Sequence, residues 1–168
     1  CGDPESTFNE ILIKTLKNEV CKNSKFPIII ICSKKLFQNE LKKLKTKINL
    51  KKFENKNDLR KNKIYIIDVP FKKGNLSLLE KNEYIKKSFD VGLNLLKKNN
   101  LLALINGPIS KTTFLKGKYK GITEYLAFKT KSINEVMLIF NKELSVSPIT
   151  THVPINKVSQ KIKKEVIF

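Results

Sequence analysis

The sequence predicts an α/β protein in which helices flank a layered, mixed and mostly parallel sheet. The first observation is a continuous run of apolar, mostly β-branched residues at 28–32, which is typical of a strand covered on both faces. The second is a similar short run at 64–69, which ends at Pro70. The third is the helical spacing of apolar residues around these runs. Because strands that alternate with helices are typical of parallel sheets, the three observations together predict the α/β class.

Helices are expected on either side of the first strand. Ser6 or Thr7 can cap the earlier helix. Its apolar positions are Phe8, Ile11, Leu12, Leu16 and Val20. Ser33 can cap the later helix, whose apolar positions are Leu36, Phe37, Leu41 and Leu44. A short strand at 48–53 and a polar loop at 54–63 are predicted to follow.

The middle of the chain predicts one long helix and one further strand. A connection around Gly74 leads to a helix at 80–99, whose apolar face is formed by Tyr84, Ile85, Phe89, Leu93 and Leu96. Residues 101–105 predict a strand, and the run 106–108, Asn-Gly-Pro, ends it sharply.

The last third of the chain continues the alternation. Ser110 can cap a short helix, and a longer one is expected at 123–131. Residues 136–140 and 144–148 predict an antiparallel hairpin, which would make the sheet mixed. A last helix is expected to begin near Pro154 or Asn156 and to continue to the end of the sequence.

The charge of the chain is extreme but composed almost entirely of lysine. The 168 residues carry a formal net charge of +19, and Arg60 is the one arginine among 34 basic residues. Such a charge is compatible with nucleic-acid binding. However, the abundant Lys, Ile and Asn share A/T-rich codons, and Arg, whose planar fork suits phosphates, is nearly absent. We therefore expect a compositional bias, and we do not expect nucleic acid to be a dedicated partner.

The cysteines and the ends of the chain bear on its location. Cys1, Cys21 and Cys32 are odd in number and lack CxxC spacing, which predicts a reducing, cytoplasmic compartment. No apolar run is long enough to span a bilayer, so no membrane segment is expected. The sequence lacks an initiator Met and stops inside a predicted helix, so we expect a fragment of a longer protein.

Two polar clusters in the second half of the chain could bind a ligand. In the first, at 106–111, Ser110 and Lys111 could hold an anion, although by themselves these residues are better explained by a plain strand-to-helix turn. In the second, at 121–127, Thr123 can either cap a helix or offer its hydroxyl to a ligand.

A third cluster, at 150–154, contains the only histidine of the chain, His152. A single histidine is more often structural than a metal ligand, because a metal needs several ligands. The residues by themselves therefore leave the activity open.

In order and spacing, these clusters resemble the N-terminal half of the 4-hydroxythreonine-4-phosphate dehydrogenase family of vitamin B6 biosynthesis. That family has a GDP-type opening, a TGP-x-x-K motif, a GHTE motif, a VMML-like strand and a TTH-x-P motif. The corresponding stretches here are 2–4, 106–111, 121–127, 135–139 and 150–154. The resemblance implies that 1–168 is the N-terminal part of a larger two-lobed α/β enzyme like the isocitrate and isopropylmalate dehydrogenases, with no internal linker assigned.

The resemblance also implies an activity, cofactors and partners. Family members are homodimers that use NAD to oxidise the secondary alcohol of 4-phosphohydroxythreonine, and the β-keto acid formed then loses carbon dioxide. A divalent metal (Zn, Mg or Co) polarises the hydroxyl. By the motif match, His152 is the first of three histidine ligands and Thr123 contacts the substrate. Lys111 lies in a loop near the site and would suit the phosphorylated substrate.

Two departures from the family pattern concern the same site. Ile122 replaces the family's GHTE histidine, which contacts the substrate, and Ile can neither donate nor accept a hydrogen bond. Residues 5–9 replace the glycines of the family's opening. The other two metal histidines belong to the family's C-terminal half, beyond Phe168. The leading hypothesis is thus that the chain is part of such a dehydrogenase. The alternative is that it is a non-catalytic basic α/β module that binds nucleic acid or acidic partners.

Overall fold

The computed structural model describes residues 2–18, 21, 23–71, 77–99, 101–133 and 135–164. The chain divides into two compact units, Cys1–Phe114 and Leu115–Phe168. Val20 and Gly74, which the sequence placed in a helix and in a connection, lie outside the described residues.

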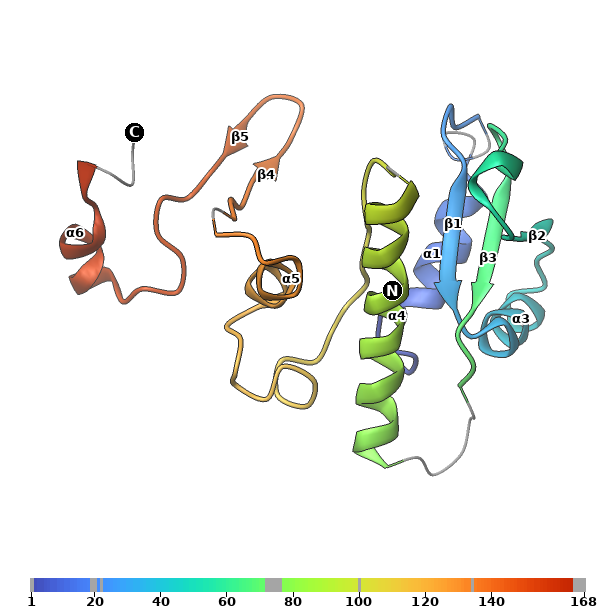
Figure 1. Cartoon of the computed structure of the whole chain (residues 1–168), viewed down its shortest axis with the longest axis horizontal. Helices are drawn as coiled ribbons and strands as arrows, with labels where there is room; N and C mark the ends of the chain where they lie inside the picture. The colour runs from blue at the N-terminus through green and yellow to red at the C-terminus, as the bar shows by residue number, and fades with distance from the viewer. Residues whose placement is uncertain are drawn as a thin grey trace. The chain divides into compact units, whose positions relative to one another are not determined.

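The first unit is built on a purely parallel sheet of three strands. Its order is β1 (Ile28–Cys32), β3 (Ile64–Asp68) and β2 (Leu50–Lys52), so that β3 is central (Figure 1). Ile64 pairs with Ile28 on one side and with Leu50 on the other. The strands predicted at 28–32, 48–53 and 64–69 are therefore confirmed, and the short helix η1 (Lys56–Asp58) lies in the predicted loop.

Helices cover both faces of this sheet, which confirms the α/β class. Helices α1 (Phe8–Leu16) and α3 (Lys34–Lys43) share one core with the strands, whose buried members are Ile13, Leu16, Ile30, Cys32, Phe37, Leu41 and Ile66. Helix α4 (Leu78–Asn99) lies on the opposite face, against β1 (Figure 1). Among the described residues, no helix has both the length and the apolarity needed to cross a membrane.

The Ser33 cap and most of the predicted apolar faces are confirmed in this unit, whereas Thr7, the N-cap residue of α1, makes no side-chain cap hydrogen bond. Ser33 caps α3, since its Oγ accepts a hydrogen bond from the Leu36 N–H at 3.4 Å. In α1, however, Ile11 is exposed and Ile13 is fully buried, so the predicted apolar face was wrong at this position. The sheet packs on the side of α1 that carries Ile13 and Leu16, and the spacing alone does not select between neighbouring stripes.

The strand predicted at 101–105 is absent. Leu102 and Ile105 are 77% and 80% exposed, and the segment has irregular backbone with a bend at Leu102. A strand needs a neighbour to complete its hydrogen bonds, and within the described ranges no strand pairs with this one. The apolar pattern was therefore not sufficient to form it.

The second unit contains α5 (Ile122–Thr130), the hairpin β4 (Ile139–Phe140) and β5 (Ser145–Val146), η2 (Ile155–Lys157) and α6 (Val158–Lys161). The predicted hairpin is confirmed as antiparallel, but it is shorter than expected and forms a sheet of its own. At the predicted start of the last helix lies the 3-10 turn η2, and α6 itself begins at Val158. The prediction that this helix continues to the end of the sequence was wrong, because the backbone of Ile162 is extended and α6 ends at Lys161.

Candidate functional site

Two motifs that lie a hundred residues apart in sequence meet in the first unit. The Asp3 N–H donates a hydrogen bond to the Pro108 carbonyl at 3.2 Å. A Cβ on Gly107 would lie 2.3 Å from Cγ of Phe8, a separation that atoms do not tolerate. Glycine is therefore required at 107 because the ring of α1 packs directly on its backbone.

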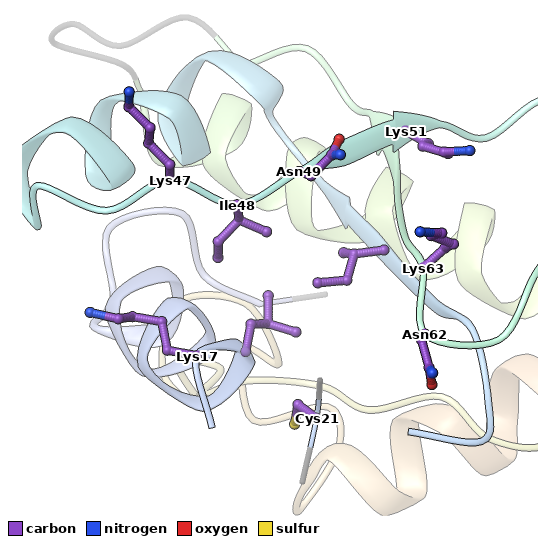
Figure 2. Close-up of a pocket in the computed structure, with 10 residues that line it drawn as sticks. Lys17, Cys21, Lys47, Ile48, Asn49, Lys51, Asn62 and Lys63 are labelled. Atoms are coloured by element: carbon purple, nitrogen blue, oxygen red, sulfur yellow. The ribbon is translucent and has the colours of Figure 1, made fainter. Parts of the chain in front are cut away.

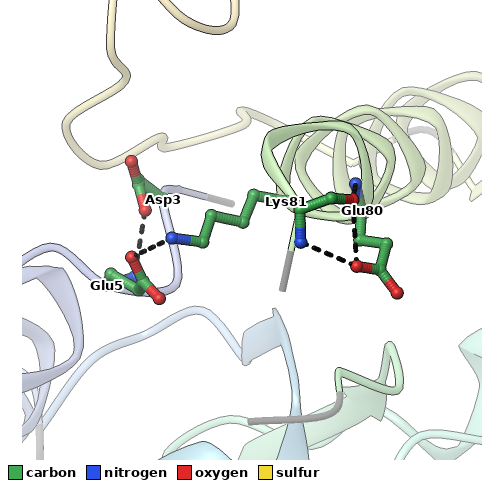
Figure 3. Close-up of polar contacts among 5 residues, drawn as sticks. Asp3, Glu5, Glu80 and Lys81 are labelled. Atoms are coloured by element: carbon green, nitrogen blue, oxygen red, sulfur yellow. Dashed lines mark hydrogen bonds and ion pairs between the residues drawn. The ribbon is translucent and has the colours of Figure 1, made fainter. Parts of the chain in front are cut away.

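The first turns of α4 hold both of these motifs. Lys81 Nζ forms an ion pair with Glu5 Oε2 at 2.6 Å, and Figure 3 shows its side chain extended toward that carboxylate. Asn82 Nδ2 donates a hydrogen bond to the Thr113 carbonyl at 2.9 Å. One helix terminus thus fixes the opening segment and the 106–113 segment within the same unit.

Lys111 lies at the end of this arrangement, on an exposed turn. Ser110 Oγ accepts a hydrogen bond from the Thr113 N–H at 3.2 Å, so Ser110 stabilises the turn, and the predicted short helix does not form. The exposed ammonium of Lys111 is accessible to an anion. Lys111 belongs to the first unit, whereas Ile122, Thr123 and His152 belong to the second.

Ile122 and Thr123 are the first two residues of α5, and both are partly buried. The residue that precedes the helix is Gly121, whose backbone is extended and whose position has no side-chain cap. The prediction that Thr123 might cap the helix is therefore wrong, because Thr123 lies inside the first turn. Its hydroxyl is not needed as a cap.

His152 lies beside the same helix terminus. Its Nε2 is 3.8 Å from Glu124 Oε1, and the two side chains are 40% and 28% exposed. The backbone of His152 is left-handed, with φ of 56°, which is uncommon for a residue other than glycine. The structure thus brings three predicted residues, Ile122, Thr123 and His152, to one end of one unit.

Glu124 was not singled out from the sequence. An acidic residue in the first turn of a helix is ordinary, because it interacts favourably with the helix dipole. Two features of the sequence could have indicated Glu124: it follows Thr123 in the GHTE-like motif, and the chain has a single histidine, His152, that needs a polar partner. Only the fold shows that its carboxylate faces that histidine.

The donor atoms at this place suit a divalent cation in part. Imidazole nitrogen and carboxylate oxygen are both ligands of zinc and similar ions. Within the described ranges, however, no three His, Cys, Asp or Glu side chains come together in a way that could hold a metal ion. The described part of the chain can therefore contribute to such a site but does not complete one.

The carboxyl ends of β1 and β3 are a second place where a ligand site could lie. The polar groups there instead make hydrogen bonds that stabilise the fold. The Tyr84 hydroxyl accepts a hydrogen bond from the Ser33 N–H at 2.9 Å, and Asp68 Oδ1 accepts one from the Lys34 N–H at 2.8 Å. Burial raises the pKa of Tyr84 to about 12 and that of the Cys32 thiol to about 12. Both groups are therefore neutral, and Cys32 is not an activated nucleophile.

A hollow of about 350 Å³ lies at the opposite edge of this sheet, where β2 and β3 begin. Its apolar surface comes from Leu16, Ile48 and Ile64, and Figure 2 shows Lys17 and Lys47 extending away from it. None of the four residues predicted to bind substrate or metal lines it. The hollow is therefore distinct from the candidate site.

Known structures share the fold of this chain. The crystal structure of 4-hydroxythreonine-4-phosphate dehydrogenase from Klebsiella pneumoniae matches with a TM-score of 0.80 at 20% identity, over 99% of this chain and 53% of that one. That from Burkholderia phymatum matches with a TM-score of 0.76 at 24% identity, over 99% and 52%. The protein is thus of the α/β class that these structures define.

Sequence comparison gives the family. A family model described as "Pyridoxal phosphate biosynthetic protein PdxA" matches residues 24–168. The chain therefore belongs to the PdxA family, which confirms the resemblance seen in its motifs.

The curated relatives extend well beyond this chain. 4-Hydroxythreonine-4-phosphate dehydrogenases from Sulfurihydrogenibium sp. (strain YO3AOP1) and Aquifex aeolicus are 34% and 26% identical over 99% of the chain. A protein of Oceanobacillus iheyensis with the provisional name D-threonate 4-phosphate dehydrogenase is 28% identical over 98%. The chain spans about half the length of these relatives, 52% of each.

Proposed function

We propose that the intact protein is an NAD-dependent, metal-requiring dehydrogenase that oxidises 4-phosphohydroxythreonine. The observation that carries this proposal is the 34% identity, over 99% of the chain, to a 4-hydroxythreonine-4-phosphate dehydrogenase. In the proposed reaction, the secondary alcohol loses a hydride to NAD and a proton to the surroundings. The β-keto acid that results then loses carbon dioxide.

The residues of this chain have separate roles in the proposal. His152 is a ligand of a divalent cation (Zn, Mg or Co), and the exposed imidazole beside Glu124 is compatible with that role. The cation supplies Lewis-acid polarisation of the substrate oxygen when bound. Thr123 donates or accepts a hydrogen bond to the substrate, and the ammonium of Lys111 attracts its phosphate.

Ile122 makes a second substrate worth testing. The side chain that replaces the family's histidine cannot hydrogen-bond, so the pocket loses one polar contact with the substrate. D-threonate 4-phosphate, named for one relative, is also a phosphorylated hydroxy acid but lacks the amino group. Because Ile122 changes the contact that the pocket makes with its substrate, oxidation of D-threonate 4-phosphate is the second candidate reaction.

The assembly and location of the protein are part of the same proposal. We place the enzyme in the cytoplasm, as its cysteine content suggests, and as a homodimer, as the family resemblance implies. Nucleic acid is not a partner in this proposal. If the basic surface instead made the protein a dedicated nucleic-acid-binding module, binding would show sequence preference as well as a steep loss with salt.

The decisive experiment measures NADH formation by the intact protein with each phosphorylated substrate, with and without added divalent metal. The proposal predicts metal-dependent turnover of 4-phosphohydroxythreonine that His152→Ala abolishes. Unchanged turnover in His152→Ala would overturn the assignment of that residue, and no turnover with either substrate would overturn the function.

The variant Ile122→His tests the choice of substrate. If the pocket keeps the family geometry, the new imidazole restores a polar contact and raises kcat/KM for 4-phosphohydroxythreonine relative to D-threonate 4-phosphate. A fall in kcat/KM for both substrates would instead show that the pocket is built around Ile122.

A further inference from the structure

The carboxylate of Glu124 has no role in the function proposed above, yet it is the charged group that faces His152. The two side chains approach to 3.8 Å, between Glu124 Oε1 and His152 Nε2. This is an ion-pair separation and is longer than a hydrogen bond. A small rotation of either partly exposed side chain would close it to hydrogen-bond distance.

The backbone around the pair is shaped to leave it space. A Cβ on Gly121 would lie 3.0 Å from Glu124 Oε2 and 3.9 Å from His152 Nε2, so both side chains lie close to the bare α-carbon of this glycine. Gly121 has an extended backbone that any residue could adopt, with φ of −160°. The reason for a glycine here is therefore the space it leaves beside the pair.

Only one nitrogen of the imidazole faces the carboxylate. Within the described part of the chain, no hydrogen bond engages Nδ1 of His152. A histidine that binds a metal through one nitrogen typically donates the N–H of the other to a carboxylate or carbonyl, which fixes the ring and its tautomer. The observed arrangement approaches that pattern, because Nε2 lies 3.8 Å from Glu124 Oε1. Closing this separation would form the hydrogen bond and leave Nδ1 for a cation.

We infer that Glu124 is a positioning residue for the divalent-metal site, an inference that rests on the proposed function of His152. The carboxylate accepts a hydrogen bond from Nε2–H, which fixes the orientation of the ring and leaves the Nδ1 lone pair for the cation. Glu124 does not itself bind the cation in this arrangement.

A purely structural role must be separated from this one. Glu124 is the third residue of α5, where an acidic side chain stabilises the helix N-terminus. Glu10 is the third residue of α1, which has the same length of nine residues, and it pairs with Lys14 rather than with a histidine. Glu10→Gln is therefore a matched control for the loss of a first-turn acid.

The test is a titration of the intact protein with Co²⁺, followed by the visible absorption of the bound ion. Glu124→Ala should weaken Co²⁺ binding by about 10- to 100-fold, and Glu124→Gln, which keeps an acceptor oxygen, should weaken it less. The absorption spectrum at saturation should match that of the wild type, because the ligands are unchanged. Glu10→Gln should bind Co²⁺ as the wild type does.

Three results would overturn the inference. The first is a Co²⁺ affinity of Glu124→Ala equal to that of the wild type, and the second is no Co²⁺ binding by the wild type. The third is an altered spectrum of Glu124→Ala at saturation, which would make Glu124 a direct ligand. Circular dichroism checks folding, and if Glu124→Ala is unfolded then Glu124→Gln decides alone. NADH formation by the wild type separates the two proposals, because a turnover-competent enzyme with an unaffected Glu124→Ala refutes only this inference.

Discussion

The two units of the molecule bury their apolar side chains to very different extents. In the first unit, Ile13, Phe37 and Phe89 are completely buried between helices and sheet. In the second, the apolar residues of the hairpin and its flanks are exposed, and Phe140 and Ile155 are 72% and 94% accessible. Among the described residues, the buried apolar core thus lies mainly in the first unit.

This contrast shows that an apolar pattern predicts the type of an element separately from its burial. In the first unit β1, β2 and β3 each have a neighbour, and the helices cover the faces of their sheet, so pattern and burial agree there. The predicted strand at 101–105 has no neighbour and does not form. In the second, β4 and β5 pair with each other, and a two-stranded hairpin is only marginally stable in water. The pattern therefore predicts the type of an element, whereas burial requires something to pack against it.

The largest expected difference between the two units is in the effect of truncating one phenylalanine of each, in the 168-residue chain. Phe37→Ala should lower the free energy of unfolding by about 3–5 kcal/mol, because it opens a cavity in the core. Phe140→Ala should change it by less than about 0.5 kcal/mol, because the ring is exposed. Urea titration followed by circular dichroism measures both. A loss of several kcal/mol for Phe140→Ala would show that the hairpin is packed and would break the comparison.

A second test concerns the contact between Gly107 and Phe8. Gly107→Ala should destabilise the first unit by about 1–3 kcal/mol, since the added methyl overlaps the ring. Adding Gly107→Ala to the Phe8→Ala variant should cost less stability than adding it to the wild type, because the ring is then gone. Thermal melting of the four proteins measures both losses. Additive losses would mean that the ring does not pack on this glycine.

The alkaline limit of stability should also be set in the first unit. Burial raises the pKa of Cys32 from 9.0 and that of Tyr84 from 10.0, each to about 12. The folded protein therefore keeps protons that the unfolded chain releases, and the free energy of unfolding falls as pH rises from about 9 toward 12. We expect a loss of about 1–2 kcal/mol by pH 10, and Cys32→Ala should make the decline shallower. A Tm that is constant between pH 9 and 10 would contradict this.

The smallest expected effect on stability is that of Gly121→Ala in the second unit. Its backbone is extended and the nearest atom is a carboxylate oxygen on a flexible side chain, so stability should change by less than about 0.5 kcal/mol. The same change displaces Glu124 and should weaken Co²⁺ binding by the intact protein. A stability loss as large as that of Gly107→Ala would remove the distinction between the two glycines.

Much of the fold was predictable from local patterns, and much of the site was not. The strands at 28–32 and 64–69, the Ser33 cap and the long helix follow from apolar spacing and one hydroxyl. The absent strand at 101–105 and the exposed Ile11 were wrong predictions, because both depend on which neighbour is present. His152 and Thr123 were selected as site residues from motifs and stay predictions, whereas the approach of Glu124 to His152 is seen only in the fold.

The sequence by itself determined the α/β class, the family and the residues that differ from it, above all Ile122, because these are carried by residue order and spacing. The tertiary structure decided which groups meet: Gly2 and Asp3 with Gly107 and Pro108, and Glu124 with His152. Such meetings depend on chain segments that lie far apart in sequence, and packing and hydrogen bonding between those segments select them. No local pattern contains that information.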